Sequence, residues 1–103
     1  MSNKSKVAIV TGAGRYRGIG RSTALVLAKK GINVIVTGTG RNPETFPDDE
    51  KKMKWNDVFS TSEEISNLGV KSSAYVTDVS DENSVKKMVN NVIEEYGQID
   101  ILV

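Results

Sequence analysis

Four glycines stand between a short apolar run and a segment with helical periodicity, and this arrangement could bind a diphosphate. The run Val7–Val10 is apolar throughout, as in a strand of a parallel sheet that is covered on both faces. We predict that Gly12 and Gly14 turn the chain sharply at positive φ. Without Cβ atoms, Gly18 and Gly20 would let a phosphate approach the backbone where a helix begins. The free N–H groups and partial positive charge of that helix end favour an anion there.

The sequence after the glycines supports this interpretation, because such a loop is informative only between a strand and a helix. One helical face is predicted to contain Ile19, Thr23, Val26 and Leu27, at positions i, i+4, i+7 and i+8. Gly31, which follows two lysines, would end the helix. Residues 32–37 are then predicted to form a second buried strand.

At these positions the chain resembles the short-chain dehydrogenase/reductase family. The family carries Thr-Gly-x-x-x-Gly-x-Gly directly after its first strand, and here Thr11-Gly12 and Gly18-Ile19-Gly20 match in residue type. The loop between them is two residues longer than in the family pattern. The resemblance implies an α/β fold of Rossmann type, a doubly wound parallel sheet in β-α-β-α-β-α-β order with strands arranged 3-2-1-4. Residues 1–103 would form the N-terminal, dinucleotide-binding part of a single, incomplete domain.

Other phosphate-binding or metal-binding sites match the residues less well. A nucleotide P-loop needs Gly-x4-Gly-Lys-Ser/Thr, whereas Gly20-Arg21-Ser22 lacks the lysine and position 15 is arginine. A phospho-receiver domain would need acidic residues after the first strand to hold Mg²⁺, and Val10-Thr11 supplies none. A purely structural glycine turn is the remaining alternative.

The second half of the chain continues the alternation of strands and helices. We predict a strand at 72–77, a helix that starts at Ser80-Asp81-Glu82 and ends at Gly97, and a strand at 99–103. The helix has the clearest apolar face of the chain, made of Val85, Met88, Val89, Val92, Ile93 and Tyr96. A further helix is predicted from a capping box at 61–64, with Ile65 and Leu68 on its apolar face and Gly69 at its end. The first two helices should cover one face of the sheet and the last helix the other, leaving the fourth strand as an open apolar edge.

A loop insertion at about 38–57 is long for a connection after a strand. Pro47 could begin a short helix in it, with Phe46 and Trp55 as apolar anchors. The pairs Asp48/Lys52 and Glu50/Lys54 have the spacing of ion pairs within a helix. The segment is interpreted either as a flap over the adenosine end of a cofactor or as a solvated surface excursion.

The resemblance also implies which residues bind the cofactor. Asp78 and Val79 match the position where the family holds the adenine ring, although Asp78 could instead cap a turn. NAD enzymes place an acid at the end of the second strand, and NADP enzymes use arginine for the 2′-phosphate. Residues 37–41 contain no acid, so we expect NADP(H) to be preferred, with NAD(H) as the alternative. The predicted cofactor-binding residues are therefore Gly12, Gly14, Arg15, Arg17, Gly18, Ile19, Gly20, Arg41, Asp78 and Val79.

The family transfers hydride between a nicotinamide and a carbonyl or alcohol, using a tyrosine with a lysine four residues later, a serine and an asparagine. The residues four positions after Tyr16, Tyr75 and Tyr96 are glycine, valine and aspartate. The family's Asn-Asn-Ala-Gly would follow the fourth strand, beyond Val103. We therefore expect no catalytic residue within 1–103, and expect this part alone to be inactive. A free-standing binding or regulatory module without turnover is the alternative.

Composition narrows the classes of partner and chemistry. The net charge of +1 argues against nucleic acid or an anionic membrane surface as the main partner. The chain has no cysteine and no histidine, which excludes disulfides, thiol catalysis and zinc–thiolate sites within it. No signal peptide or membrane span is expected, and the protein is expected in the cytoplasm. The expected partners are a dinucleotide and a small carbonyl or alcohol substrate, with the complete protein forming a homo-oligomer.

Overall fold

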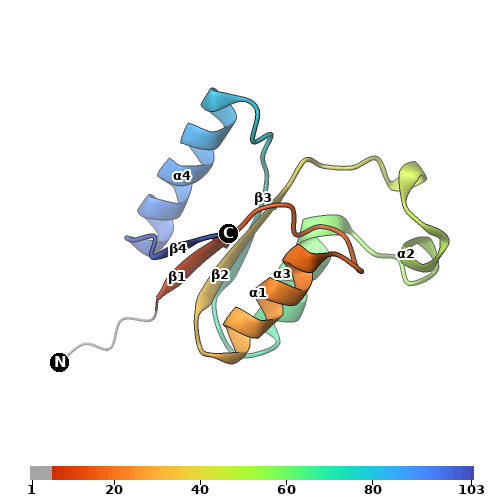
Figure 1. Ribbon diagram of the computed structural model, residues 1–103, viewed down its shortest axis with the longest axis horizontal. Coiled ribbons are helices and arrows are strands. Elements are labelled where there is room, and N and C mark those ends of the chain that lie inside the picture. The colour runs from red at the N-terminus through yellow and green to blue at the C-terminus, as the bar shows by residue number, and fades with distance from the viewer. Residues whose placement is uncertain (1–5) are drawn as a thin grey trace.

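A four-stranded parallel sheet forms the centre of the protein in a computed structural model, which describes residues 6–103 (Figure 1). The strands lie in the order β3-β2-β1-β4, as predicted, and all neighbours are parallel. Their bounds are β1 Val7–Val10, β2 Asn33–Gly38, β3 Ser72–Val76 and β4 Ile101–Leu102. The doubly wound Rossmann-type architecture is therefore confirmed.

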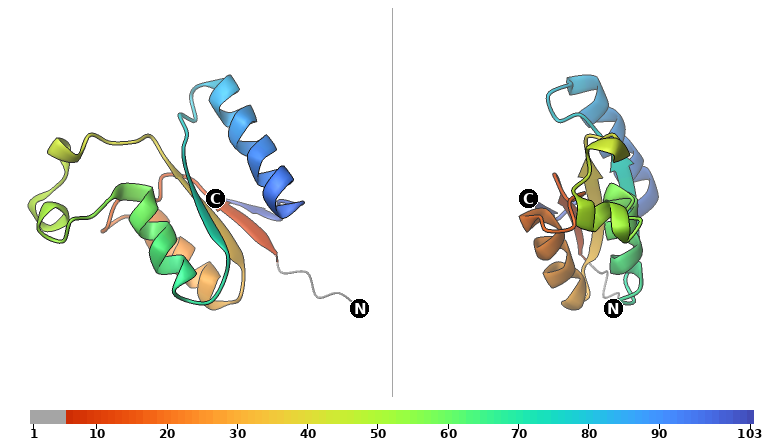
Figure 2. Two further views of the ribbon diagram at one scale, coloured as in Figure 1. Left: turned by 180° about the vertical axis from the view of Figure 1, so that it is seen from behind. Right: turned by 90° about the vertical axis from the view of Figure 1, so that its right-hand side faces the viewer.

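Three helices cover the sheet from its two faces. Helices α1 (Ile19–Lys29) and α3 (Asp57–Ser66) lie on one face, and α4 (Glu82–Tyr96) lies alone on the other (Figures 1 and 2). Two shorter helices follow β2, a 3₁₀ turn at Pro43–Thr45 and α2 at Asp48–Lys52. The segment that contains α2 extends beyond the carboxyl ends of the strands (Figure 1).

The core is divided between the two faces by the alternation of side chains along the strands. Val34 and Val36 of β2 pack with the buried residues of α1 and α3. Ile35, between them, packs with Met88 and Val92 of α4 on the opposite face. The uninterrupted apolar run of β2 thus reflects burial on both sides, as expected for a central parallel strand.

The sequence pattern misplaced the buried face of α1. Ile19 and Val26 are 86% and 52% exposed, whereas Ala24 and Ala28 are buried against the sheet. Leu27 is only partly buried at the edge of the same cluster. Alanine has a small side chain, so burial of Ala24 and Ala28 lets α1 lie close to the strands. A pattern based on hydrophobicity does not detect this role, because alanine is only weakly hydrophobic.

Two further boundaries differ from the predictions. Helix α3 begins at Asp57, so Thr61 is buried inside the helix and is not its cap. Leu68 is 43% exposed, although Ile65 is buried as predicted. Strand β4 is shorter than 99–103, because only Ile101 and Leu102 pair in the regular ladder. Gly69, which follows α3, and Gly97, which follows α4, both have positive φ. This conformation fits their predicted role of ending the helices.

Asp100 connects β4 to the middle of the sheet. Its Oδ2 atom accepts hydrogen bonds from the backbone N–H of Val7 at 2.8 Å and from Nε2 of Gln98 at 2.7 Å. These bonds, the Val7 N–H first among them, lower the pKa of the Asp100 carboxyl below its ordinary value. The contacts of Asp100 are therefore structural.

We expect the Asp100 interaction to make the protein sensitive to acid. A carboxyl whose pKa is lower in the folded state stabilises that state above the unfolded pKa of about 3.9, and this stabilisation is lost as the pH falls through the folded value. Asp100→Asn keeps an acceptor oxygen but has no charge to titrate. Thermal melts between about pH 6 and pH 2 should therefore show a smaller fall in melting temperature for the variant than for the wild type. The carboxyls of Asp49 and Asp78, whose pKa values are also lowered, add the same acid-dependent loss of stability to both proteins. Parallel curves for the two proteins would contradict this role.

Candidate functional site

A pocket of about 300 Å³ opens at the carboxyl ends of the strands. Residues that follow β1, that end β2 and that follow β3 meet there. Ligands of open α/β sheets bind in this crevice, outside the carboxyl ends of the strands. The lining consists of Thr11, Gly12, Gly14, Arg15, Thr37, Gly38, Thr39, Arg41, Asp57, Thr77 and Val79.

Two of the glycines in the loop after β1 are required for different reasons. Gly12 has φ +64°, so the predicted turn at positive φ is confirmed, and a Cβ there would meet no other atom within 4 Å. Gly14 is not among the residues with positive φ, so that part of the prediction is wrong. A Cβ on Gly14 would instead overlap the carboxyl group of Asp57. Gly14 is therefore needed for close approach of a side chain from α3.

The helix end beside the pocket has the properties that an anion site requires. Gly18 is the N-cap residue of α1, with extended backbone, and its position gives the helix no side-chain cap. The first turn of α1 contains no acidic residue that would compensate the partial positive charge. Gly20 has another function, because a Cβ there would lie 2.6 Å from the carbonyl oxygen of Gly12. Gly20 thus allows α1 to pack directly against the loop.

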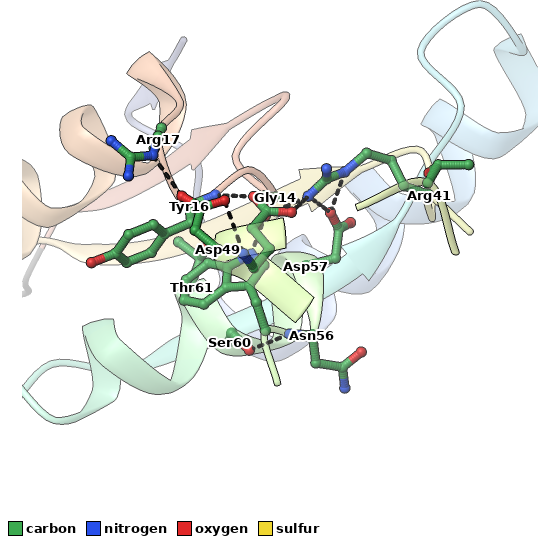
Figure 3. A network of polar contacts seen from close by, with 12 residues as sticks. Gly14, Tyr16, Arg17, Arg41, Asp49, Asn56, Asp57, Ser60 and Thr61 are labelled. Carbon is green, nitrogen blue, oxygen red and sulfur yellow. Dashed lines mark hydrogen bonds and ion pairs between the residues drawn. The ribbon is translucent and has the colours of Figure 1, made fainter. Parts of the chain in front are cut away.

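The insertion packs on the glycine-rich loop and holds its backbone (Figure 3). The carbonyl oxygen of Gly14 accepts hydrogen bonds from Nε1 of Trp55 at 2.6 Å and from Nη2 of Arg41 at 3.2 Å. Two positions past Gly14, the N–H of Tyr16 donates to Oε2 of Glu50 at 2.8 Å. Trp55 is buried, as is Phe46, so the predicted anchors are confirmed. The longer loop and the insertion are therefore one structural unit, and the segment does not extend freely into solvent.

Helix α3 also contacts the loop. The hydroxyl of Thr61 donates to the carbonyl oxygen of Ala13 at 2.8 Å, and both residues are buried. No local sequence pattern marks Thr61 and Glu50 as positioning residues, because each is more than 30 positions away from its partner in the loop. Only the apolar anchors Phe46 and Trp55 signalled that the insertion packs on something.

Arg41 is held between two acids at the rim of the pocket (Figure 3). Its Nε and Nη2 atoms both lie 2.8 Å from Oδ1 of Asp57, and Nη2 lies 3.1 Å from Oε1 of Glu50. The guanidinium also lies over the ring of Phe46, at 4.4 Å from its centre. The predicted helical pair Glu50/Lys54 is thus replaced by a longer-range pair, and Asp48/Lys52 is not among the ion pairs of residues 6–103.

Two other arginines near the loop are paired as well. Nε of Arg17 lies 2.6 Å from Oδ2 of Asp49, and the hydrogen bond and charge of Asp49 raise the pKa of this exposed arginine. Arg21 makes two bonds of 2.7 Å to the carboxylate of Glu64 and lies over the ring of Tyr16 at 4.6 Å. Arg21 was not predicted as part of the site, and it connects α1 to α3.

The predicted site residues separate into two groups. Gly12, Gly14, Arg15, Arg41 and Val79 line the pocket. Arg17, Gly18, Ile19, Gly20 and Asp78 are not part of its lining, although four of these lie at the start of α1.

Asp78 makes the contacts of a turn. Its Oδ1 atom accepts bonds from the N–H of Ser80 at 2.9 Å and from the Ser80 hydroxyl at 2.6 Å. These bonds lower the pKa of the Asp78 carboxyl. Turn capping therefore accounts for Asp78 in this structure, and Val79 lines the pocket.

The described part of the chain, residues 6–103, contains no cluster of three residues suited to bind a metal ion. Nor does any helix within these residues have the length and apolar character needed to cross a bilayer. The crevice is lined by the glycine loop and a paired arginine, and the uncapped N-terminus of α1 follows that loop.

The chain belongs to the short-chain dehydrogenase family, whose model matches residues 6–103. It is 41% identical over 99 residues to 3-oxoacyl-(acyl-carrier-protein) reductase FabG of Staphylococcus aureus, covering 96% of this chain and 34% of that protein. Over 103 residues it is 37% identical to 12alpha-hydroxysteroid dehydrogenase of a Clostridium species, with 95% and 34% covered. The structure of NAD⁺-bound xylitol dehydrogenase superposes with a TM-score of 0.73 and 31% identity, covering 98% of this chain and 33% of that one. The chain thus spans about a third of the length of these proteins.

The site fits the dinucleotide that the family implies. The space beside Gly12 is open, and the N-terminus of α1 has neither a side-chain cap nor an acid in its first turn. In addition, the hydroxyl of Thr37 at the pocket is buried and has no hydrogen-bond partner within residues 6–103. Polar groups without partners at a crevice of this kind are the groups that a polar ligand would satisfy.

Proposed function

We propose that residues 1–103 are the cofactor-binding part of an NAD(P)-dependent oxidoreductase that transfers hydride between nicotinamide and a carbonyl or alcohol. The observation that carries the proposal is the uncapped N-terminus of α1, which follows a glycine loop at the carboxyl edge of the sheet. Membership of the short-chain dehydrogenase family supports the same reaction class. The relatives named above act, by their names, on a 3-oxoacyl group, a hydroxysteroid and xylitol, so we propose no particular substrate.

In this proposal the chain binds and orients the cofactor. The backbone from Gly18 to Gly20 would receive the diphosphate, and Val79 would meet the adenine ring at the opposite side of the crevice. The bound nicotinamide supplies or accepts the hydride. Trp55, Thr61 and Glu50 hold the loop in place through the bonds described above, and thereby keep the diphosphate site formed before the cofactor arrives.

The acid and base of the reaction are expected outside residues 1–103, because no tyrosine in this sequence is followed four positions later by lysine. We therefore propose that this part alone does not catalyse turnover. The same absence favours one alternative function, a dinucleotide-binding or regulatory module without catalysis. Hydride transfer by the protein expressed from its full reading frame would exclude that alternative. The cytoplasmic location and the homo-oligomeric state expected from the sequence remain part of the proposal.

The choice between NADP(H) and NAD(H) is a prediction that the comparisons leave open. Arg17, Arg41 and the lack of an acid at the end of β2 favour NADP(H), since a guanidinium suits a 2′-phosphate. Both arginines are nevertheless paired with acids, which reduces the positive charge that a phosphate would meet. Titration of the protein with each dinucleotide measures the preference directly.

Gly18→Val is the test of the diphosphate site. A branched side chain at the N-cap would occupy the space in front of the α1 N–H groups, and its Cβ would already lie 3.3 Å from the Arg15 carbonyl oxygen. We expect the affinity for both dinucleotides to fall at least about tenfold, the effect of losing one charge-assisted hydrogen bond. Calorimetric titration with NADPH and NADH, with a thermal melt as a control for folding, measures this. Unchanged affinity in a folded variant would refute the assignment.

A further inference from the structure

We infer that Glu50 and Asp57 set the selectivity of the pocket at the 2′ position of the adenosine ribose, by offering a carboxylate to a 2′-hydroxyl and opposing a 2′-phosphate. The inference rests on the proposed function, because it assumes that a dinucleotide binds in this crevice. Neither residue belongs to β2 or to the loop after β1. Glu50 lies in α2 within the insertion, and Asp57 is the first residue of α3.

The position of Asp57 places its carboxylate where β2 ends. A Cβ added to Gly38, the last residue of β2, would lie 3.2 Å from Oδ2 of Asp57. The same carboxyl group abuts Gly14 in the glycine loop, and Asp57 lines the pocket. An acid at the end of the second strand accepts hydrogen bonds from a ribose hydroxyl in NAD-binding folds. Here β2 carries no acid at that end, and Asp57 reaches the same place from α3. This acid counts against the NADP(H) preference expected from the sequence, which considered only the residues of β2 itself and the arginines near it.

The contacts of Arg41 with Asp57 use only one of the two carboxylate oxygens. Both bonds from Arg41 end on Oδ1, whereas Oδ2 is the atom beside Gly38. Oδ2 is therefore the oxygen suited to accept a ribose hydroxyl. The two functions, holding Arg41 and accepting from the ribose, use different atoms of one carboxylate.

The charges around Arg41 would oppose a 2′-phosphate. One guanidinium faces two carboxylates, and the side chains of Arg41, Glu50 and Asp57 are 15%, 3% and 8% exposed. The group of three therefore carries one net negative charge in a poorly solvated place. A 2′-phosphate bound there would approach this charge, whereas a hydroxyl would not be repelled.

Removal of the acids should leave Arg41 able to bind a phosphate. Arg41 would still lie over Phe46 and would still donate to the carbonyl oxygen of Gly14. In Glu50→Gln/Asp57→Asn the net charge of the group changes from −1 to +1. Asparagine also tolerates the positive φ of +53° that Asp57 adopts.

The test uses two probes of the adenosine end, 5′-AMP and adenosine 2′,5′-bisphosphate, together with NADH and NADPH. We expect the double variant to raise the affinity ratio of the 2′-phosphorylated to the unphosphorylated ligand by about tenfold or more relative to wild type. Asp57→Asn alone should change the ratio in the same direction by less, which covers the case in which the double variant does not fold. The matched control is Glu44→Gln/Asp48→Asn, which removes two exposed acids of the same insertion.

The outcomes separate this inference from the proposed function. A ratio within about twofold of wild type in a folded double variant, or an equal rise in the control, would overturn the inference while leaving dinucleotide binding intact. If the wild-type protein expressed from its full reading frame binds none of the four ligands, the proposed function fails, and the inference fails with it.

Discussion

Gly20→Ala is expected to destabilise the protein and to reduce dinucleotide binding, although alanine is the better helix former. The added Cβ would lie 2.6 Å from the carbonyl oxygen of Gly12 and 3.0 Å from Cα of Ala13. All these atoms belong to the backbone or are fixed to it, so no side-chain rotation can relieve the contact. Helix α1 would have to move away from the loop, and the N–H groups of its first turn would move with it.

The expected cost exceeds the gain in helix propensity. Replacing glycine by alanine inside a helix contributes up to about 1 kcal/mol of stability. Overpacking of a close contact costs about 1–3 kcal/mol and more where only backbone can yield. We therefore expect a net loss of stability in chemical denaturation, and a weaker affinity for NADPH and NADH in calorimetry.

Gly18→Ala is the matched control for this prediction. It introduces the same methyl group two residues earlier, where the nearest contacts, to Cβ and the carbonyl oxygen of Arg15, would be 3.3 Å. Contacts of that length can relax by small shifts, so the control should lose less stability than Gly20→Ala. Equal stability of the two variants would show that the approach of α1 to the loop is not limited by Gly20.

Trp55→Ala is expected to have the largest effect on stability of any substitution in the insertion. Trp55 is 8% exposed, its ring packs edge-on against Tyr16 at 5.3 Å, and Nε1 donates to Gly14 at 2.6 Å. Truncation of a buried tryptophan to alanine costs about 3–5 kcal/mol. Because its contacts are with the glycine loop, we expect the loss to be accompanied by weaker dinucleotide binding.

Two further variants separate the contributions at this position. Trp55→Phe keeps most of the apolar contact and removes only the donor, which should cost about 0.5–1.5 kcal/mol, because the carbonyl oxygen of Gly14 still accepts from Arg41. Phe59→Ala removes an aromatic ring that is 49% exposed on the neighbouring helix and serves as the control. Denaturant unfolding of all three measures the order. A Trp55→Ala variant as stable as Phe59→Ala would contradict the view that the insertion supports the loop.

The sequence by itself was sufficient for the fold class and the order of the elements. Apolar runs such as Val34–Val36 predict strands buried on both faces, and glycines such as Gly31 and Gly97 mark helix ends through their positive φ. These signals are local, since each depends on the conformational preference of a few consecutive residues. The strand order was predicted from the resemblance of the glycine loop to that of the short-chain dehydrogenase family, to which the chain belongs. The structure confirms this order.

Local patterns failed where the deciding contact was distant in sequence. The hydrophobic pattern assigned Ile19 and Val26 to the buried face of α1, but the sheet selects Ala24 and Ala28 because they permit close packing. Thr61 resembles a helix cap in the sequence, yet it lies inside α3, where its hydroxyl donates to the carbonyl oxygen of Ala13 in the glycine loop. In each case the partner lies on another element, and nothing in the surrounding residues indicates it.

The arrangement around the pocket was likewise decided by tertiary structure alone. The glycines identified the diphosphate loop, whereas the charges near it depend on Arg41 meeting Glu50 and Asp57, which are 9 and 16 positions further along the chain. Whether an arginine is available to a ligand depends on which acids the fold brings within about 3 Å of it, since charge interactions weaken steeply with distance and solvation. The sequence therefore determined that this chain has a dinucleotide-type fold, and only the packing of the insertion on the loop determined the chemistry at the rim of its pocket.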